Sequence, residues 1–398
     1  MSKSASAAIR QPELKPMREA AQLDSLTGLR GVLAVAIIVF HYSYFWEIDV
    51  PTVEYGIIFP KMHVFVDMFF MMSGFIMGYV HWRDFATGVD WQGYKRYIAL
   101  RIGRIYPIHF IVLVGFLVLE LDNVFRGDFS QFAHADRRPE AIITNLLLIH
   151  AWGTEPNLGW NYPSWSISAE WAAYLTFPVL VYIFLRPKAS TALVSFGLLI
   201  AAVFFLANLP PEPHGAGGID RTFELGAVRG IFSFSMGLGL FRLYHDLKLY
   251  RGMNSVASTL FSLGSIIALF VGFYFKINDG YLLLLVGAIV LSVTFDGNKM
   301  RWFFETRFIM FLGEISYSIY MVHALVQRVF VKLIGMGWVS FEGFWQAIIA
   351  TQLMLVVSVF AAYVLYKLFE DPMRKLVRVW VKSIDAKAAA KAAAKVAS

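Results

Sequence analysis

Ten long apolar segments constrain the fold of this chain more than any other feature. A helix that crosses a lipid bilayer needs about 20 mostly apolar residues, and segments near that length recur along the sequence. They are 27–46, 64–82, 102–120, 167–186, 191–208, 226–244, 256–275, 280–295, 309–330 and 345–368. Only 16% of the residues are charged, against about 25% in soluble domains. The sequence therefore predicts an all-α fold, a polytopic membrane bundle of about ten transmembrane helices.

The predicted membrane domain covers residues 26–376, with a short segment on either side. Residues 1–25 form a polar N-terminal segment, and residues 377–398 form a tail rich in Ala and Lys that we expect to be a solvated helix near anionic lipid. The first apolar segment lacks a small-residue cleavage pattern, so we interpret it as a span and not as a signal peptide. The apolar stretch 141–151 is too short to cross the bilayer, which favours an interfacial or re-entrant position.

Basic residues are distributed very unevenly between the two predicted sides. Twenty-six of the 35 Lys and Arg residues fall on the side that holds both termini, and nine fall on the other. Positive loops mark the cytoplasmic side, so we expect both termini in the cytoplasm. The net charge of +7 is explained by this asymmetry, and no nucleic-acid partner is predicted. The chain has no cysteine, which excludes disulfides, thiolate metal sites and a cysteine nucleophile.

Two ionisable residues share one face of the first predicted span. Arg30 lies near its cytoplasmic end, and His41 lies 11 residues further on. Eleven residues are about three helical turns, so both side chains project in nearly the same direction, about 16 Å apart along the axis. Ionisable groups inside a bilayer are costly and indicate function. The alternative is that Arg30 only anchors the helix end and His41 only packs.

The second predicted span begins with His63 and Asp67, four residues apart on one face. We consider two roles for Asp67, which are to orient a histidine of another helix or to cap its own helix. Gly74 and Gly78 form a small-xxx-small pair, which is typical of closely packed membrane helices.

Arg101 and Arg104 precede the third span and lie on one helix face. Paired guanidinium groups suit phosphate recognition, whereas ordinary positive-inside anchoring is the alternative.

Further polar residues occur inside later spans. Glu170 follows Ser164, Ser166 and Ser168 into the fourth span, and we expect it to pair with His41, with a structural pairing to another polar group as the alternative. Tyr317 and His323 lie in the stretch FLGEISYSIYMVH and are further candidates for the same site, although a structural role for His323 is at least as plausible. Motifs of soluble serine hydrolases, zinc proteases and phosphate-binding loops are absent from the sequence, and no metal site is expected.

Five segments, taken in order, resemble the acyltransferase-3 family of integral membrane acyltransferases. They are LDSLTGLRGVLAVAIIVFH, VDMFFMMSGFIMG, RIGRIYPIH, SWSISAEWAAYLTFP and the pair FLGEISYSIYMVH and FEDPMR. The family is similar in its ten or so spans, its Arg-x10-His motif and its Arg-x-x-Arg motif, which here fall on Arg30 with His41 and on Arg101 with Arg104. The resemblance implies an essential histidine, arginines that hold the acyl donor, and a role for Glu170 behind Ser166.

The activity that the resemblance implies is transfer of an acyl group from acyl-CoA, most simply acetyl-CoA, to a hydroxyl of a saccharide or lipid-linked saccharide. Histidine suits the role of base for such a hydroxyl, and it can instead carry the acyl group first. The donor is a co-substrate, and no tightly bound cofactor is expected. Membrane lipid is the remaining expected partner, and a bacterial inner membrane is the expected location. A proton-coupled transporter of a small polar solute is the alternative from another class, because buried ionisable residues also build such carriers.

Overall fold

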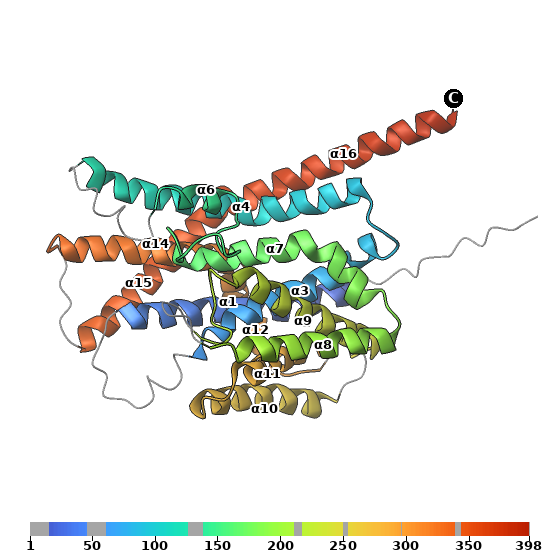
Figure 1. Ribbon diagram of the computed structural model, residues 1–398, viewed down its shortest axis with the longest axis horizontal. Helices are drawn as coiled ribbons and strands as arrows, with labels where there is room; N and C mark the ends of the chain where they lie inside the picture. Colours follow the sequence, from blue (N-terminus) through green and yellow to red (C-terminus); the bar gives the residue numbers. More distant parts are fainter. Residues whose placement is uncertain are drawn as a thin grey trace, which may run out of the picture.

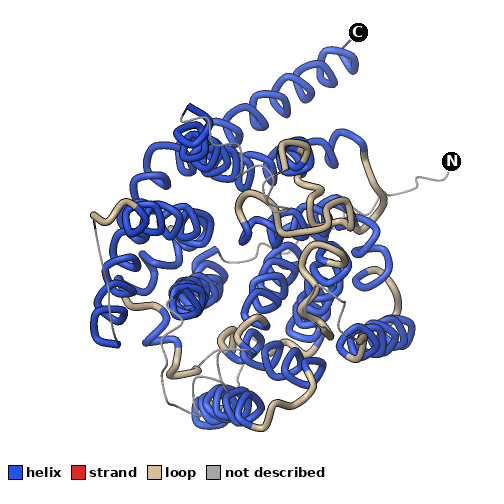
Figure 2. The backbone as a smooth tube through the Cα atoms, turned by 60° about the vertical axis from the view of Figure 1, so that its left-hand side comes forward, coloured by secondary structure: helices blue, strands red, loops and turns tan. Residues whose placement is uncertain are grey.

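The computed structural model describes residues 16–45, 61–125, 138–210, 217–249, 254–295, 297–338 and 344–397, and these residues form helices and connecting turns without any strand. Figure 1 shows most long helices running side by side, and Figure 2 shows several of them nearly end-on, as in a bundle. The long helices are α1 (Pro16–Phe45), α3 (Val64–Phe85), α4 (Trp91–Phe125), α7 (Trp165–Leu180), α8 (Ala189–Ala207), α9 (Gly226–Asp246), α10 (Ser255–Tyr274), α11 (Asp279–Ser292), α14 (Ser316–Gly335), α15 (Phe344–Leu365) and α16 (Asp371–Ala397). The short ones are α6 (Ala141–Leu146), η2 (Tyr162–Ser164), η3 (Val181–Leu185), α12 (Arg301–Phe304), α13 (Arg307–Glu314) and η4 (Tyr366–Glu370).

Eight helical stretches of the described chain are long and apolar enough to cross a membrane, which confirms the polytopic helical bundle. They are Asp24–Tyr42, Val64–Phe85, Trp91–Leu121, Tyr162–Leu185, Ala189–Ala207, Ser255–Tyr274, Ser316–Gly335 and Trp345–Ile384. The two remaining predicted spans are also helices. However, α11 has only 14 residues, and α9 contains the buried Arg229 and does not meet the same length and composition measure. The count is thus eight by that measure, and ten only if α9 and α11 are included.

Glycines allow α3 and α9 to pack with their backbones almost in contact. A Cβ atom added to Gly74 would lie 2.0 Å from the carbonyl oxygen of Phe234, and one added to Gly237 would lie 2.0 Å from that of Met71. A Cβ atom added to Gly78 would likewise lie only 2.6 Å from a ring carbon of Phe241. The predicted packing role of Gly74 and Gly78 is therefore confirmed.

The predicted span 309–330 is wrong as a single helix, because the chain breaks between α13 and α14. The Ser316 hydroxyl donates to the Gly313 carbonyl at 2.8 Å, an acceptor that an unbroken helix would use for the backbone N–H four residues on. Gly313 also lies against α1, where an added Cβ would be 2.1 Å from the Thr27 carbonyl oxygen. This close approach places the start of α14 beside the segment of α1 that carries Arg30.

The short stretch 141–151 and the two ends of the chain can be compared with the sequence predictions. The stretch 141–151 contains only the six-residue helix α6, which is too short to span, as predicted. Helix α16 runs through the predicted boundary at 376 and 377, and Val377 packs against Gly103 of α4. The predicted N-terminal segment is described only from Pro16 onward, and loop 46–60 lies outside the described residues.

Candidate active site

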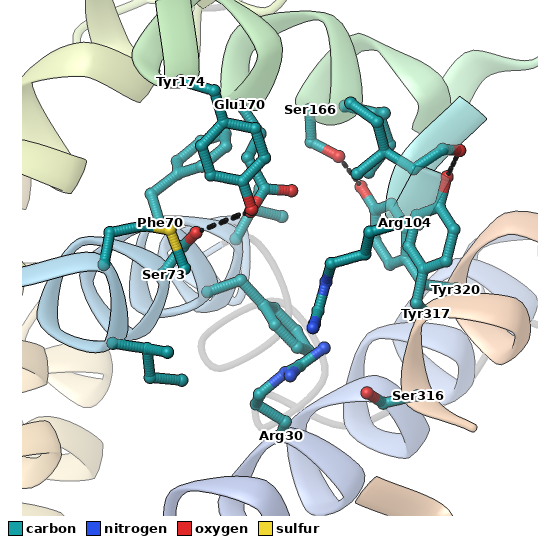
Figure 3. Close-up of a pocket in the computed structure, with 16 residues that line it drawn as sticks. Arg30, Phe70, Ser73, Arg104, Ser166, Glu170, Tyr174, Ser316, Tyr317 and Tyr320 are labelled. Carbon is teal, nitrogen blue, oxygen red and sulfur yellow. Dashed lines mark hydrogen bonds between the residues drawn. The ribbon is translucent and has the colours of Figure 1, made fainter. Parts of the chain in front are cut away.

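A cavity with about 730 Å³ of unfilled space, including its open mouth, lies among α1, α3, α4, α7 and α14. Each of these helices contributes at least one polar side chain to its wall, namely Arg30, Ser73, Arg104, Glu170 and Tyr320 (Figure 3). Apolar side chains of α3 complete the wall. The cavity thus combines an apolar body with a few converging polar groups, as ligand sites in proteins usually do.

Arg30 and Arg104 reach into this cavity from different helices. Figure 3 shows Arg30 of α1 and Arg104 of α4 pointing toward one another. Within the described part of the chain, neither guanidinium has a carboxylate within ion-pair distance. Two neighbouring cations without an acidic partner in a membrane protein are costly unless an anion joins them. The pair is therefore suited to bind an anionic group such as a phosphate.

Arg101 lies outside the cavity wall, although it is only one turn from Arg104. Its Nη1 donates to the sulfur of Met77 at 3.4 Å, and its guanidinium packs over the rings of Tyr97 and Tyr174, each 5.8 Å from the ring centroid. The structure therefore brings Arg104 to the site directly and Arg101 only through Tyr174.

Glu170 faces the cavity but does not pair with His41 as expected. Its Oε1 accepts hydrogen bonds from the hydroxyls of Ser73 at 2.6 Å and Tyr174 at 2.5 Å. Ser73 and Tyr174 were not singled out by the sequence. The signals available were a lone hydroxyl in an apolar span and a tyrosine four residues after the glutamate, on the same helix face.

His41 instead contacts His323 of α14. His323 Nε2 lies 3.2 Å from His41 Nδ1, and the two rings stack with centroids 5.0 Å apart. Tyr162 of η2 presents its ring to the edge of His41 at 5.1 Å. His41 is not among the residues that line the cavity. Tyr320 connects the histidine pair to the cavity. It lines the cavity, and its carbonyl oxygen accepts a hydrogen bond from His323 Nδ1 at 2.6 Å.

The remaining candidates Ser166 and Tyr317 both line the cavity. The Ser166 hydroxyl donates to the Tyr320 hydroxyl at 2.9 Å, and that hydroxyl donates to the Pro163 carbonyl at 3.0 Å. The Tyr317 hydroxyl donates to the Ile105 carbonyl of α4. These contacts fix the two tyrosines of α14 as walls of the site.

Asp67 is held in a fully buried ion pair and not beside His41. Its Oδ2 lies 2.7 Å from Arg229 Nη2, both side chains are 0% exposed, and Ser233 donates to its Oδ1 at 2.8 Å. The guanidinium also stacks on Trp165. Asp67 therefore joins α3 to α9 and does not orient a histidine, which was one of the two roles considered for it.

His63 belongs to a second charged cluster at the start of α3. Its Nε2 lies 3.3 Å from Asp279 Oδ2, and Lys61 pairs with Asp279 Oδ1 at 2.5 Å. Burial favours neutral imidazole, but the nearby carboxylates of Asp220 and Asp279 outweigh it and raise the pKa of His63 above its ordinary value. His63 and its partners are not among the residues that line the cavity.

Replacing Asp67 with alanine is expected to destabilise the protein by about 3–5 kcal/mol, because the buried Arg229 guanidinium loses its fully buried partner and keeps only Asp220 at 3.2 Å. Thermal unfolding in detergent measures the effect. The double replacement of Asp67 with leucine and Arg229 with methionine should recover most of the loss, since neither member of the fully buried pair remains. Asp246→Asn, which removes an exposed pair with Arg242, is the control and should change little. Equal effects of the Asp67 and Asp246 variants would contradict this interpretation.

Comparison with known proteins identifies the class of this molecule. The family model described as "Acyltransferase domain" matches residues 23–367. The chain belongs to this acyltransferase family. A curated relative, "Acyltransferase MdmB" of Streptomyces mycarofaciens, is 27% identical over 376 residues, which cover 89% of this chain and 92% of the relative. No solved structure matches the chain.

The protein is therefore a membrane acyltransferase, and membership of the family decides against the transporter alternative. The match includes every residue that lines the cavity, as well as His41 and His323. An acyltransferase needs a place for its acyl donor and a group that handles the proton of the acceptor. The cavity with Arg30 and Arg104 and the pair His41 and His323 offer chemistry suited to these two tasks.

Proposed function

We propose that this acyltransferase moves an acyl group, most simply acetyl, from acyl-CoA to a hydroxyl of a saccharide or lipid-linked saccharide. The observation that carries the proposal is the pair of cavity-facing guanidinium groups, Arg30 and Arg104, neither of which has a carboxylate within ion-pair distance among the described residues. Coenzyme A carries phosphates, and bidentate guanidinium contacts to phosphate are strong and geometrically specific.

The spacing along α1 supports the same donor. His41 follows Arg30 by 11 residues on one helix, which corresponds to about 16 Å along its axis. An extended pantetheine arm has a comparable length. With its phosphates at the arginines, the arm passes Tyr320 and brings the thioester carbonyl to His41. The cavity as described ends before His41, so the arm must continue beyond the lining residues.

The proposed chemistry uses His41 as the base. Its imidazole takes the proton of the acceptor hydroxyl, the oxygen attacks the thioester carbonyl, and the carbon–sulfur bond breaks. The proton then passes to the leaving sulfur, which gives free coenzyme A and an ester. Prior acylation of His41 is the other route. In that route the imidazole first displaces the thiol of coenzyme A, and the acceptor hydroxyl then displaces the imidazole. The products are again free coenzyme A and an ester.

The acceptor class and the orientation rest on the sequence. Saccharide hydroxyls are the acceptors that the family resemblance implies, and the excess of basic residues on one side favours cytoplasmic termini. That orientation places the Arg30 end of the cavity toward the cytoplasm, where acyl-CoA is found, and His41 toward the opposite side. A bacterial inner membrane is the location that we propose.

Thiol release tests the proposed donor. Purified protein in detergent, mixed with acetyl-CoA and a thiol reagent, should release coenzyme A slowly, and membranes that contain saccharide lipids should accelerate the release. Propionyl-CoA and succinyl-CoA in parallel reactions report the preferred acyl group. Failure to bind any acyl-CoA, measured by calorimetry, would rule out the donor that we propose while leaving the acyltransferase class intact.

A further inference from the structure

The contact between His41 and His323 raises the question of which ring nitrogen carries the hydrogen in each imidazole. His41 and His323 come from α1 and α14 and meet through His41 Nδ1 and His323 Nε2, 3.2 Å apart. A hydrogen bond at this contact needs one N–H and one lone pair. The hydrogen therefore belongs either to His41 Nδ1 or to His323 Nε2, and the surrounding groups decide between them.

The backbone fixes the tautomer of His323. Its Nδ1 lies 2.6 Å from the carbonyl oxygen of Tyr320, and a carbonyl oxygen only accepts, so Nδ1 carries the hydrogen. His323 is 0% exposed, and in the described part of the chain no carboxylate contacts it, so the neutral form is favoured. A neutral imidazole with hydrogen on Nδ1 has its lone pair on Nε2.

Among the described neighbours of His323, His41 is the one that can donate a hydrogen bond to the lone pair on Nε2. The hydroxyl of Tyr162 lies 3.3 Å from Nε2, but it donates its proton to Gln327 Oε1 at 3.0 Å. Tyr42, the residue after His41 on α1, donates to the backbone carbonyl of His323 at 2.8 Å. This second link between α1 and α14 holds the two imidazoles at the same level of the bundle.

We propose that His323 is a positioning residue that holds His41 in the Nδ1–H tautomer and leaves Nε2 as its reactive nitrogen. His41 Nδ1 then donates to His323 Nε2, and His41 Nε2 carries the lone pair that takes the acceptor proton. The imidazole of His323 fills the place that a carboxylate occupies beside the catalytic histidine of many hydrolases. The assignment of Nε2 as reactive rests on the proposed function, whereas the tautomer itself does not.

The tautomer is measurable without any turnover. Full-length protein labelled with 15N-histidine gives nine imidazole patterns in long-range 1H–15N correlation spectra, and the pattern lost in His41→Gln belongs to His41. We expect the Nδ1–H pattern for His41 in the wild type. His323→Leu removes the acceptor on α14 and leaves only the backbone carbonyl of Ile37 beside the His41 ring, so the share of the Nδ1–H form should fall. His323→Gln, whose side-chain carbonyl accepts in nearly the same place, should retain the Nδ1–H form.

Kinetics separate a positioning role from a merely structural one. We expect kcat of His323→Leu to fall by about 100-fold or more, with the Kd for acetyl-CoA unchanged, and His323→Gln to recover most of the loss. Val326→Ala, which loosens the buried face of α14 one turn away, is the packing control and should leave the His41 pattern unchanged.

Two results would overturn the inference. One is an Nε2–H pattern for His41 in the wild type, and the other is a His41 pattern that does not respond to His323→Leu. The expected tautomers together with absent acyl transfer in the wild type would instead count against the proposed donor or acceptor, and would leave the hydrogen-bond assignment standing.

Discussion

His41→Gln is expected to lower kcat for acyl transfer by about 1,000-fold or more, because the variant loses the group that takes the acceptor proton or carries the acyl group. Glutamine retains much of the volume of the imidazole and an acceptor at its end, so the bundle should remain folded. The measurement is the initial rate of ester formation at saturating acetyl-CoA, combined with a melting curve and the Kd for coenzyme A.

The donor affinity of His41→Gln provides the control for this prediction. Arg30 and Arg104 lie at the other end of the proposed donor site, so the Kd should stay within about a factor of two. A variant that retains the wild-type rate would remove His41 from the chemistry. A variant that loses donor binding together with the rate would indicate a packing defect, and the role of His41 would then have no support.

Replacing the two arginines of the cavity should weaken the binding of coenzyme A and spare the fold. A hydrogen bond to a charged group contributes about 1.5–3 kcal/mol, so Arg30→Gln and Arg104→Gln should each raise the Kd by about 10-fold to 100-fold. Neither arginine has a carboxylate within ion-pair distance in the described chain, so their loss breaks no ion pair. The melting temperature should therefore change little.

Arg101 and Arg96 are the matched controls on the same helix. Arg101 packs on Tyr97 and Tyr174 outside the cavity wall, so Arg101→Gln should affect binding less than Arg104→Gln does. Arg96 lies near the start of α4, 3.8 Å from Asp90, and Arg96→Gln should leave the Kd unchanged. Equal losses in all four variants would show a general effect of positive charge and no specific phosphate site.

The sequence predicts the membrane helices and the residues that project into the site from a single helix. Arg30 and His41 are aligned by helical geometry alone, and Gly74 is recognised because small residues mark close helix contacts. Such features depend on spacing within one element. The break before Ser316 was not predicted, because the apolar pattern continues across it and the hydrogen bond from Ser316 to the Gly313 carbonyl is not visible in the sequence.

Partners across helices were harder to predict. We expected Glu170 beside His41. Instead, Ser73 and Tyr174 donate hydrogen bonds to one carboxylate oxygen of Glu170, and His41 contacts His323. Asp67 pairs with Arg229, 162 positions away in the chain. Which of several buried polar groups meet depends on how the helices rotate and slide against one another, and hydrophobic periodicity does not encode that choice.

The most direct test follows the two halves of the donor through native membrane vesicles that contain the protein. Acetyl-CoA labelled separately in the acetyl group and in the coenzyme is added to inside-out and right-side-out vesicles. The predicted result is that acetyl label enters a saccharide ester only when the donor meets the cytoplasmic face, while the coenzyme label stays outside as free thiol. This transfer should be lost in His41→Gln. Transfer that is as fast in His41→Gln as in the wild type, or that occurs only in right-side-out vesicles, would contradict the proposed mechanism.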